Sequence, residues 1–120
     1  MEELKSGGNP EGNWPSEPVA LTDADFEKFV TKYKMVVVDC WAPWCGPCRM
    51  VSPIVDTLAK EMVGKVAFGK LNTDENGQIP MKFNISAIPT LLVFKDGKMV
   101  DRIVGAMPKE QLAGRIKRNQ

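Results

Sequence analysis

The sequence contains no histidine, which is the most common general base and the most common nitrogen ligand for metals. Schemes that pair serine or cysteine with histidine are therefore excluded, and Cys, Asp, Glu, Lys and Tyr remain as chemical actors. An excess of one charge is also missing, because 16 Lys and Arg face 15 Asp and Glu, giving a net charge of +1. Without a basic field, neither nucleic acid nor an anionic membrane is expected as a partner.

Long apolar runs are absent as well, since none approaches the ~20 residues of a membrane span. Cysteine is scarce and clustered, at Cys40, Cys45 and Cys48. Secreted disulfide scaffolds have an even, dispersed set instead, and residues 1–18 show no basic and apolar signal-peptide pattern. We therefore expect a cytoplasmic protein.

A chain of 120 residues is long enough for one domain, and 43% hydrophobic with 26% charged residues is typical of a globular protein. Residues 1–18 are rich in glycine and proline and are expected to form a flexible tail, leaving residues 19–120 as the domain. The alternative is that Trp14, one of two large apolar side chains there, docks on the domain.

The pattern of the domain alternates strands and helices and predicts an α/β fold. Expected strands are residues 19–21, 35–41, 66–71, 90–94 and 99–104. Four helices are expected. The first begins at Thr22, whose capping partner is Asp25, and the second follows Cys48 and is kinked at Pro53. The third is a short turn near residues 79–83, and the fourth begins at Pro108. A strand-helix-strand unit followed by an Asp96-Gly97 hairpin predicts a mixed sheet with parallel and antiparallel pairs.

The segment Cys45-Gly46-Pro47-Cys48 places two thiols at the start of a helix that follows a buried strand. Unpaired N–H groups and the helix dipole stabilise a Cys45 thiolate there, so its pKa is expected below the free value of ~8.5. Cys48, one turn further in, can resolve a mixed disulfide formed on Cys45.

A pair of cysteines at this spacing is equally typical of half a zinc site. One spare cysteine and no histidine cannot complete four soft ligands within one chain, so a zinc or iron–sulfur site requires a dimer that shares ligands. No metal or other cofactor is expected beyond the dithiol itself.

The segment Trp41-Ala42-Pro43-Trp44-Cys45-Gly46-Pro47-Cys48 resembles the active-site signature of the thioredoxin family. The similarity runs from about residue 19 to the last helix and includes Lys70-Leu71-Asn72, Ile88-Pro89-Thr90 and Gly105. The resemblance implies the thioredoxin fold, a mixed sheet with helices on both faces. It also implies a monomeric dithiol reductant of protein disulfides, recycled by a thioredoxin reductase, in which Cys45 attacks and Cys48 resolves.

Asp39 is an acid within an apolar strand, so its pKa is expected to be raised. From the sequence alone, a functional acid and a satisfied structural acid are equally good interpretations. The resemblance favours the first, because the matching family residue accepts the proton of the buried thiol, here Cys48. Lys70 resembles the family's buried lysine beside this acid, although such a lysine alone is more often an edge residue with its ammonium in water.

The resemblance further implies a cis Ile88-Pro89 bond, beside which a substrate segment pairs as an added strand. The residues expected to form an apolar docking surface around Cys45 are Trp44, Gly46, Pro47, Ile88, Pro89, Gly105 and Ala106, with Trp41 packed below. Cys40 departs from the family, which most often has an aromatic residue there. We expect a buried inert thiol, and a regulatory or dimerising cysteine is the alternative.

Two other functions remain open. One is a thiol oxidant or isomerase of the same fold, although the family associates the Gly46-Pro47 pair with reductants. The other is a binding module whose apolar patch holds a partner protein and whose dithiol is incidental.

Overall fold

The central strand β2 (Met35–Trp41) lies in the middle of the sheet because its β-branched side chains have apolar neighbours on both faces. The structure is a computed structural model, of which residues 13–120 are described. Every residue of β2 is buried except the half-buried Trp41. The strand predicted from the apolar run is confirmed with the same bounds.

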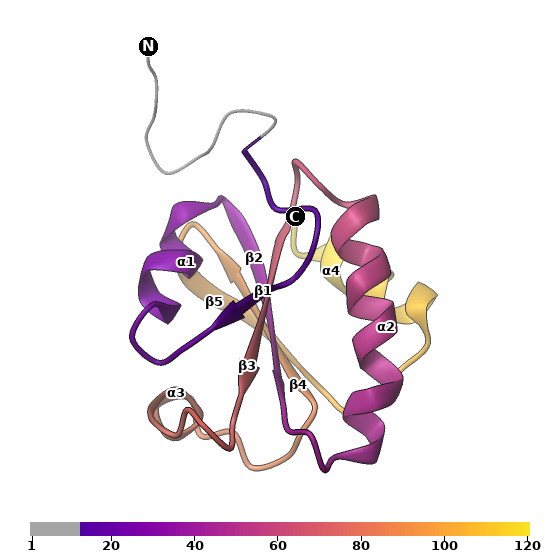
Figure 1. Ribbon diagram of the computed structural model, residues 1–120. Helices are drawn as coiled ribbons and strands as arrows, with labels where there is room; N and C mark the ends of the chain where they lie inside the picture. The colour runs from indigo at the N-terminus through magenta and orange to yellow at the C-terminus, as the bar shows by residue number, and fades with distance from the viewer. Residues whose placement is uncertain (1–12) are drawn as a thin grey trace.

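Five strands form one sheet in the order β1-β3-β2-β4-β5 (Figure 1). The others are β1 (Val19–Leu21), β3 (Ala67–Asn72), β4 (Thr90–Lys95) and β5 (Lys98–Val104). Strand β3 is parallel to β1 and β2, whereas β4 is antiparallel to β2 and β5. The predicted mixed sheet is confirmed.

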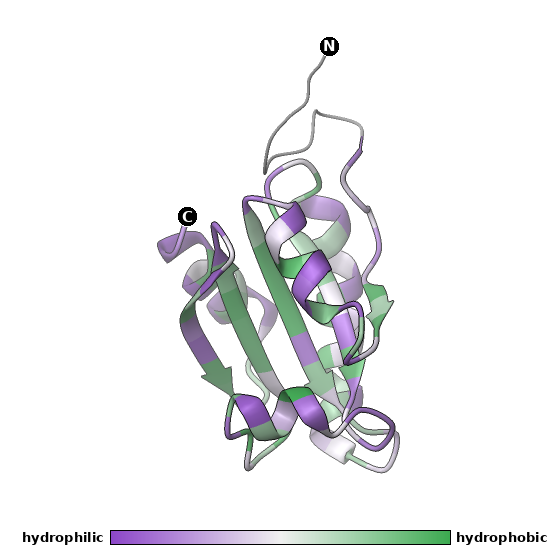
Figure 2. Ribbon diagram, turned by 90° about the vertical axis from the view of Figure 1, so that its left-hand side faces the viewer, coloured by the Kyte–Doolittle hydropathy of each residue, from purple (hydrophilic) through white to green (hydrophobic). Residues whose placement is uncertain are grey.

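Helices cover both faces of this sheet, as expected (Figure 1). Helices α1 (Phe26–Lys32) and α3 (Gln78–Lys82) lie on one side, and α2 (Gly46–Glu61) and α4 (Lys109–Arg118) on the other. Figure 2 shows the central strands as hydrophobic between helices of mixed hydropathy. Two apolar clusters fill the space between sheet and helices, one on each face.

Alternation along β2 assigns its side chains to these two faces. Val37 packs in the cluster beneath α2 and α4, whereas Val36, Val38 and Cys40 pack in the cluster beneath α1. Asp39 shares the parity of Val37, so it points to the side of α2, the helix that begins at the cysteine pair.

Turn geometry explains where the boundaries differ from those predicted. Helix α1 begins at Phe26 and not at Thr22, because residues 23–25 form a turn closed by the reciprocal bonds of Thr22 and Asp25. Pro108 is the N-cap of α4 and lies just outside its first turn. The tight hairpin is confirmed, since Asp96 and Gly97 have φ of 54° and 81°, the left-handed region that such turns require.

The segment before β1 contains Trp14, whose ring centroid lies 5.0 Å from that of Tyr33. Trp14 is half-buried and packs against the cluster on the α1 face. Of the two alternatives for this side chain, the structure has the docked one. The remaining part of the predicted tail, residues 1–12, lies outside the described residues. Within residues 13–120, no helix is long and apolar enough to cross a membrane.

Candidate functional site

Cys45 is the N-cap residue of α2, in the extended conformation that ends the turn after β2. Its Sγ accepts a hydrogen bond from the backbone N–H of Cys48 at 3.2 Å, and the two cysteines form a disulfide. Pro47 lies in the first turn, where its missing N–H leaves no bond unmade. The predicted helix-start position therefore provides an N–H group and a positive dipole end for a charge on the Cys45 sulfur.

The two cysteines differ little in exposure, since 4% of Cys45 and 2% of Cys48 is accessible. These exposed fractions do not distinguish the attacking thiol from the resolving thiol that the family resemblance implies. The two residues differ instead in the hollow that each one lines. Cys45 lines an open groove of about 510 Å³, whereas Cys48 lines a separate cavity of about 90 Å³ together with Ser52 and Lys70.

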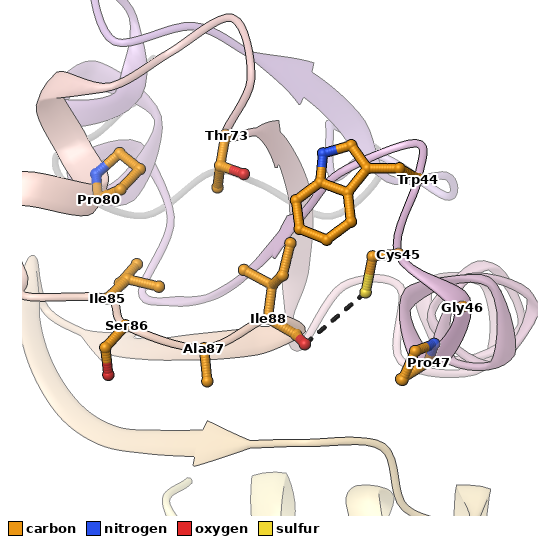
Figure 3. Close-up of a pocket in the computed structure, with 10 residues that line it drawn as sticks. All are labelled: Trp44, Cys45, Gly46, Pro47, Thr73, Pro80, Ile85, Ser86, Ala87 and Ile88. Atoms are coloured by element: carbon orange, nitrogen blue, oxygen red, sulfur yellow. Dashed lines mark hydrogen bonds between the residues drawn. The ribbon is translucent and has the colours of Figure 1, made fainter.

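The groove runs from the start of α2 to the segment before β4 (Figure 3). Trp44 and Cys45 lie at one end of it, and Pro80 and Ile85 at the other. Cys45 Sγ is 3.7 Å from the carbonyl oxygen of Ile88. The groove also includes Gly46, Pro47, Thr73, Ser86 and Ala87. A backbone carbonyl beside the sulfur suits an extended peptide that pairs along this segment.

Trp44 covers part of the groove and is 67% exposed. Its indole Nε1 donates a hydrogen bond to Asp74 Oδ1 at 3.0 Å, which fixes the ring although most of it faces solvent. Asp74 was not predicted as a site residue. It lies 30 positions away in a polar loop, and no local pattern connects it with Trp44.

Of the residues predicted to form the docking surface, Trp44, Gly46, Pro47 and Ile88 line this groove, whereas Pro89, Gly105 and Ala106 do not. The Ile88-Pro89 bond is cis, as expected, and Pro89 is buried, with its carbonyl accepting the N–H of Gly105 at 2.8 Å. Ala106 is exposed but lines another hollow of about 240 Å³ beside Met50. Trp41 packs against the cluster that contains both cysteines, as predicted.

Asp39 is fully buried, and neither of its carboxyl oxygens has a hydrogen-bond partner among the described residues. Burial raises its pKa to about 7 from an ordinary 3.8, Lys70 opposes the rise, and Asp56 adds to it. No described residue therefore provides the hydrogen bonds that would make Asp39 a satisfied structural acid. A carboxyl group with a pKa near neutrality can accept and return a proton under ordinary conditions.

Lys70 is the register partner of Asp39 on the neighbouring strand β3. Its ammonium does not extend into open water, because Nζ donates to Ser52 Oγ at 2.8 Å and lies 4.8 Å from the centroid of the Trp41 ring. Ser52 was not predicted either, since a serine within a helix gives no signal of such a contact. The structure thus brings Asp39, Lys70 and Ser52 to the side of the sheet that carries Cys48.

Cys40 points to the opposite face and is fully buried, as predicted. Burial, assisted by the neighbouring Asp39, raises the pKa of its thiol to about 12. Over residues 13–120, no group of three or more Cys, Asp or Glu side chains is placed to hold a metal ion. The chemistry of the site therefore centres on the pair of Cys45 and Cys48.

Comparison with known proteins agrees with this geometry. The family model for thioredoxin matches residues 17–118. Thioredoxin 1 of Synechococcus elongatus is 49% identical over 102 residues, and the thioredoxin of Haemophilus influenzae is 48% identical over 102 residues. Each alignment covers 84% of this chain and 95% of the relative. The chain belongs to the thioredoxin family.

The fold of a solved thioredoxin agrees as well. A mutant thioredoxin from Halobacterium salinarum superposes with a TM-score of 0.82 at 31% identity, covering 88% of this chain and 92% of that one. Like other thioredoxins, this protein is a thiol-disulfide oxidoreductase with protein-disulfide reductase activity, and Cys45 and Cys48 are its redox-active pair. The alternative of a binding module with an incidental dithiol is not favoured.

Proposed function

We propose that Cys45 is the attacking thiol and Cys48 the resolving thiol of this thioredoxin. The observation that carries the proposal is the position of Cys45, which lines the groove and caps α2. In the reduced protein, the Cys45 thiolate attacks one sulfur of a substrate disulfide. A bond forms between Cys45 and that sulfur, and the other substrate sulfur leaves as a thiolate that takes a proton from water.

The second step resolves the mixed disulfide. Asp39 in its carboxylate form accepts the proton of the Cys48 thiol, directly or through water, and the Cys48 thiolate attacks Cys45 Sγ. The bond between Cys45 and the substrate breaks, the second substrate sulfur leaves reduced, and the Cys45–Cys48 disulfide forms. Two electrons pass to the substrate. A pKa of about 7 supports this role for Asp39, because the carboxyl group can both gain and release the proton at neutral pH.

Substrate recognition is proposed to use the groove and its rim. An extended segment of a protein substrate pairs with the backbone at Ile88, whose carbonyl lies beside Cys45 Sγ. The exposed ring of Trp44 supplies an apolar face, and Asp74 holds that ring in place. Pro47, Gly46 and the Pro89–Gly105 backbone contact complete the surface next to the disulfide.

A protein that reduces disulfides needs an electron donor and a reducing compartment. A dithiol that must be regenerated after each turnover needs an electron donor, and we propose a thioredoxin reductase, by similarity to the family. Such a cycle requires a reducing compartment, which supports a cytoplasmic location and a part in electron transport and redox homeostasis. The working unit is proposed to be a monomer formed by residues 19–120, with no metal or cofactor besides the dithiol.

Trapping of substrates tests the order of the two thiols. Cys48→Ser should keep attack and lose resolution, so it should accumulate mixed disulfides with target proteins that a reductant releases. Cys45→Ser, which differs by the same single atom, should accumulate none. Complexes should be captured with both variants from the same cell extract and counted after non-reducing electrophoresis. Partners held by Cys45→Ser and not by Cys48→Ser would reverse the assigned roles.

A further inference from the structure

The Lys70 ammonium has two possible partners on one face of the sheet. Asp39 and Lys70 are register partners on β2 and β3, so their side chains leave the sheet side by side. A cation beside a buried acid normally forms an ion pair with it, yet within residues 13–120 neither Asp39 oxygen has a hydrogen-bond partner. The ammonium instead donates to Ser52 Oγ, at 2.8 Å.

Two contacts hold the ammonium in that position. Ser52 on α2 accepts one of its three N–H groups, and the face of the Trp41 ring lies 4.8 Å away, within the range of a cation–π interaction. Both residues line, with Lys70 and Cys48, the cavity of about 90 Å³. This volume leaves room for water, so the ammonium can complete its hydration there without turning toward Asp39.

We propose that Ser52 is a positioning residue, which holds the Lys70 ammonium against Trp41 and leaves the Asp39 carboxyl group without a direct cationic partner. The effect of this Ser52–Lys70 contact on catalysis rests on the proposed function of Asp39 as the proton acceptor for Cys48. A carboxylate in a direct ion pair is a weak base, whereas one whose cation is held at a distance remains basic enough to take a thiol proton.

Within residues 13–120, few other charges act on Asp39. Besides Lys70 on β3, the charge that acts on it comes from Asp56 on α2, and its register partner on β4 is the apolar Leu91. Cys48 on α2 is the titrating group whose proton is transferred. Because Asp56 is exposed and on the helix surface, solvent screens it more than Lys70, which is partly buried. The position of the ammonium is therefore the main adjustable influence on the basicity of Asp39.

Replacing Ser52 with alanine removes the hydroxyl group and keeps the helix, since alanine is the better helix former. The freed ammonium should then turn to Asp39 and lower the pKa of that carboxyl group. Moving a unit charge from ~6 to ~4 Å at an effective dielectric constant of ~20 shifts a pKa by about one unit. Ser52→Thr retains a hydroxyl group at the same carbon and should keep the native value.

The Asp39 carboxyl carbon should be titrated by NMR in the oxidised protein, where neither Cys45 nor Cys48 ionises. Ser52→Ala is compared with Ser52→Thr and with Thr57→Ala, a matched control on the same helix whose hydroxyl donates to the backbone carbonyl of Pro53. In a Lys70→Met background, Ser52→Ala should have no further effect. A pKa in Ser52→Ala that is unchanged or higher, or a decrease that persists without Lys70, overturns the proposal.

The pH dependence of insulin reduction separates this inference from the proposed function. If both hold, the acid limb of kcat/KM for Ser52→Ala moves to lower pH by the same amount as the titration. A shifted titration with an unshifted rate profile supports the role of Ser52 and refutes Asp39 as the proton acceptor. An unshifted titration refutes the role of Ser52 and leaves the proposed function of Asp39 intact.

Discussion

Replacing Asp39 with asparagine should make the protein more stable at neutral and alkaline pH. The carboxyl group is fully buried, lacks a hydrogen-bond partner among the described residues, and has a pKa of about 7 in the folded protein. In the unfolded chain the same group titrates near its ordinary value of 3.8. Asparagine has nearly the same shape and cannot ionise, so it removes the cost of burying the charge.

The sign of the effect follows from proton binding. Between pH 3.8 and about 7 the folded state holds a proton on Asp39 that the unfolded state has released, so stability decreases as pH rises through this range. Each pH unit of that range costs ~1.4 kcal/mol, so the ionised side chain lowers the free energy of unfolding by up to about 4 kcal/mol above pH 7. Asp39→Asn should gain most of this.

Urea unfolding of the oxidised protein at a series of pH values from 4 to 9 measures the effect. The difference between Asp39→Asn and the native protein should be small near pH 4, increase through pH 5 and 6, and level off above the pKa of Asp39. A difference that does not depend on pH would refute the reasoning, because it would show that asparagine acts through packing and not through the missing charge.

Asp101 provides a control of opposite sign. Its carboxyl group is hydrogen-bonded to the Arg115 guanidinium at 2.8 and 2.9 Å, and this bond holds the pKa of Asp101 below its usual range. The stability it contributes is present above the unfolded pKa and is lost as pH falls through the lower folded value. Asp101→Asn should therefore destabilise the protein at neutral pH, and the difference should disappear in acid. If both aspartates changed stability in the same direction, burial would not be the distinguishing cause.

Two further changes test packing that the structure shows. Trp14→Ala should lower the free energy of unfolding by about 1–2 kcal/mol, because the ring is half-buried against Tyr33. Deletion of residues 1–12 should leave stability and insulin reduction unchanged. Calorimetry of the two variants and the native protein measures the first quantity, and an insulin-reduction assay of the same proteins measures the second. Gly69→Ala should lower the free energy of unfolding by about 1–3 kcal/mol, since a Cβ there would lie 2.6 Å from Leu21 Cδ1. Gly77→Ala is the control, and because its Cβ would meet open space, it should lower the free energy of unfolding clearly less. Equal losses of stability in the two variants would contradict the packing argument.

Much of the fold could be predicted because local chemistry and tertiary structure agree. The β-branched run at residues 35–41 has no polar alternation except Asp39, so only a strand buried on both faces suits it, and β2 has these bounds. Asp96 and Gly97 adopt the left-handed backbone, which aspartate tolerates and glycine adopts freely because it has no Cβ, and this turn determines the antiparallel hairpin and hence the mixed sheet. The position of the cysteine pair at a helix start could also be predicted, because local sequence and tertiary structure agree there as well.

The unpredicted features depend on single contacts between distant segments. Ser52 meets Lys70 across 18 positions and Trp44 meets Asp74 across 30, and neither pair has a periodicity or a spacing that could indicate it. The start of α1 was predicted too early because the Thr22–Asp25 bonds of a capping box also close a turn before the helix. In the first two cases the deciding interaction joins polar side chains that only the folded backbone brings within reach, whereas the Thr22–Asp25 contact is local and was predicted, and only the start of the helix differs.

The alternation of β2 also decides which buried group takes part in chemistry. Asp39 and Cys40 are adjacent, both fully buried, and burial raises both pKa values, to about 7 and about 12. Only Asp39 lies on the face that carries Lys70 and α2. It ionises near neutrality because its rise, which Lys70 opposes, starts from an ordinary pKa of 3.8, whereas the rise of Cys40, which Arg102 opposes, starts from 9.0. Cys40, on the α1 face, has a thiolate fraction of roughly one in 10⁵ at pH 7. Thiol-disulfide exchange proceeds through the thiolate. Cys40 therefore cannot compete with Cys48 for the mixed disulfide on Cys45, although Cys40 and Cys45 are only five residues apart in the chain.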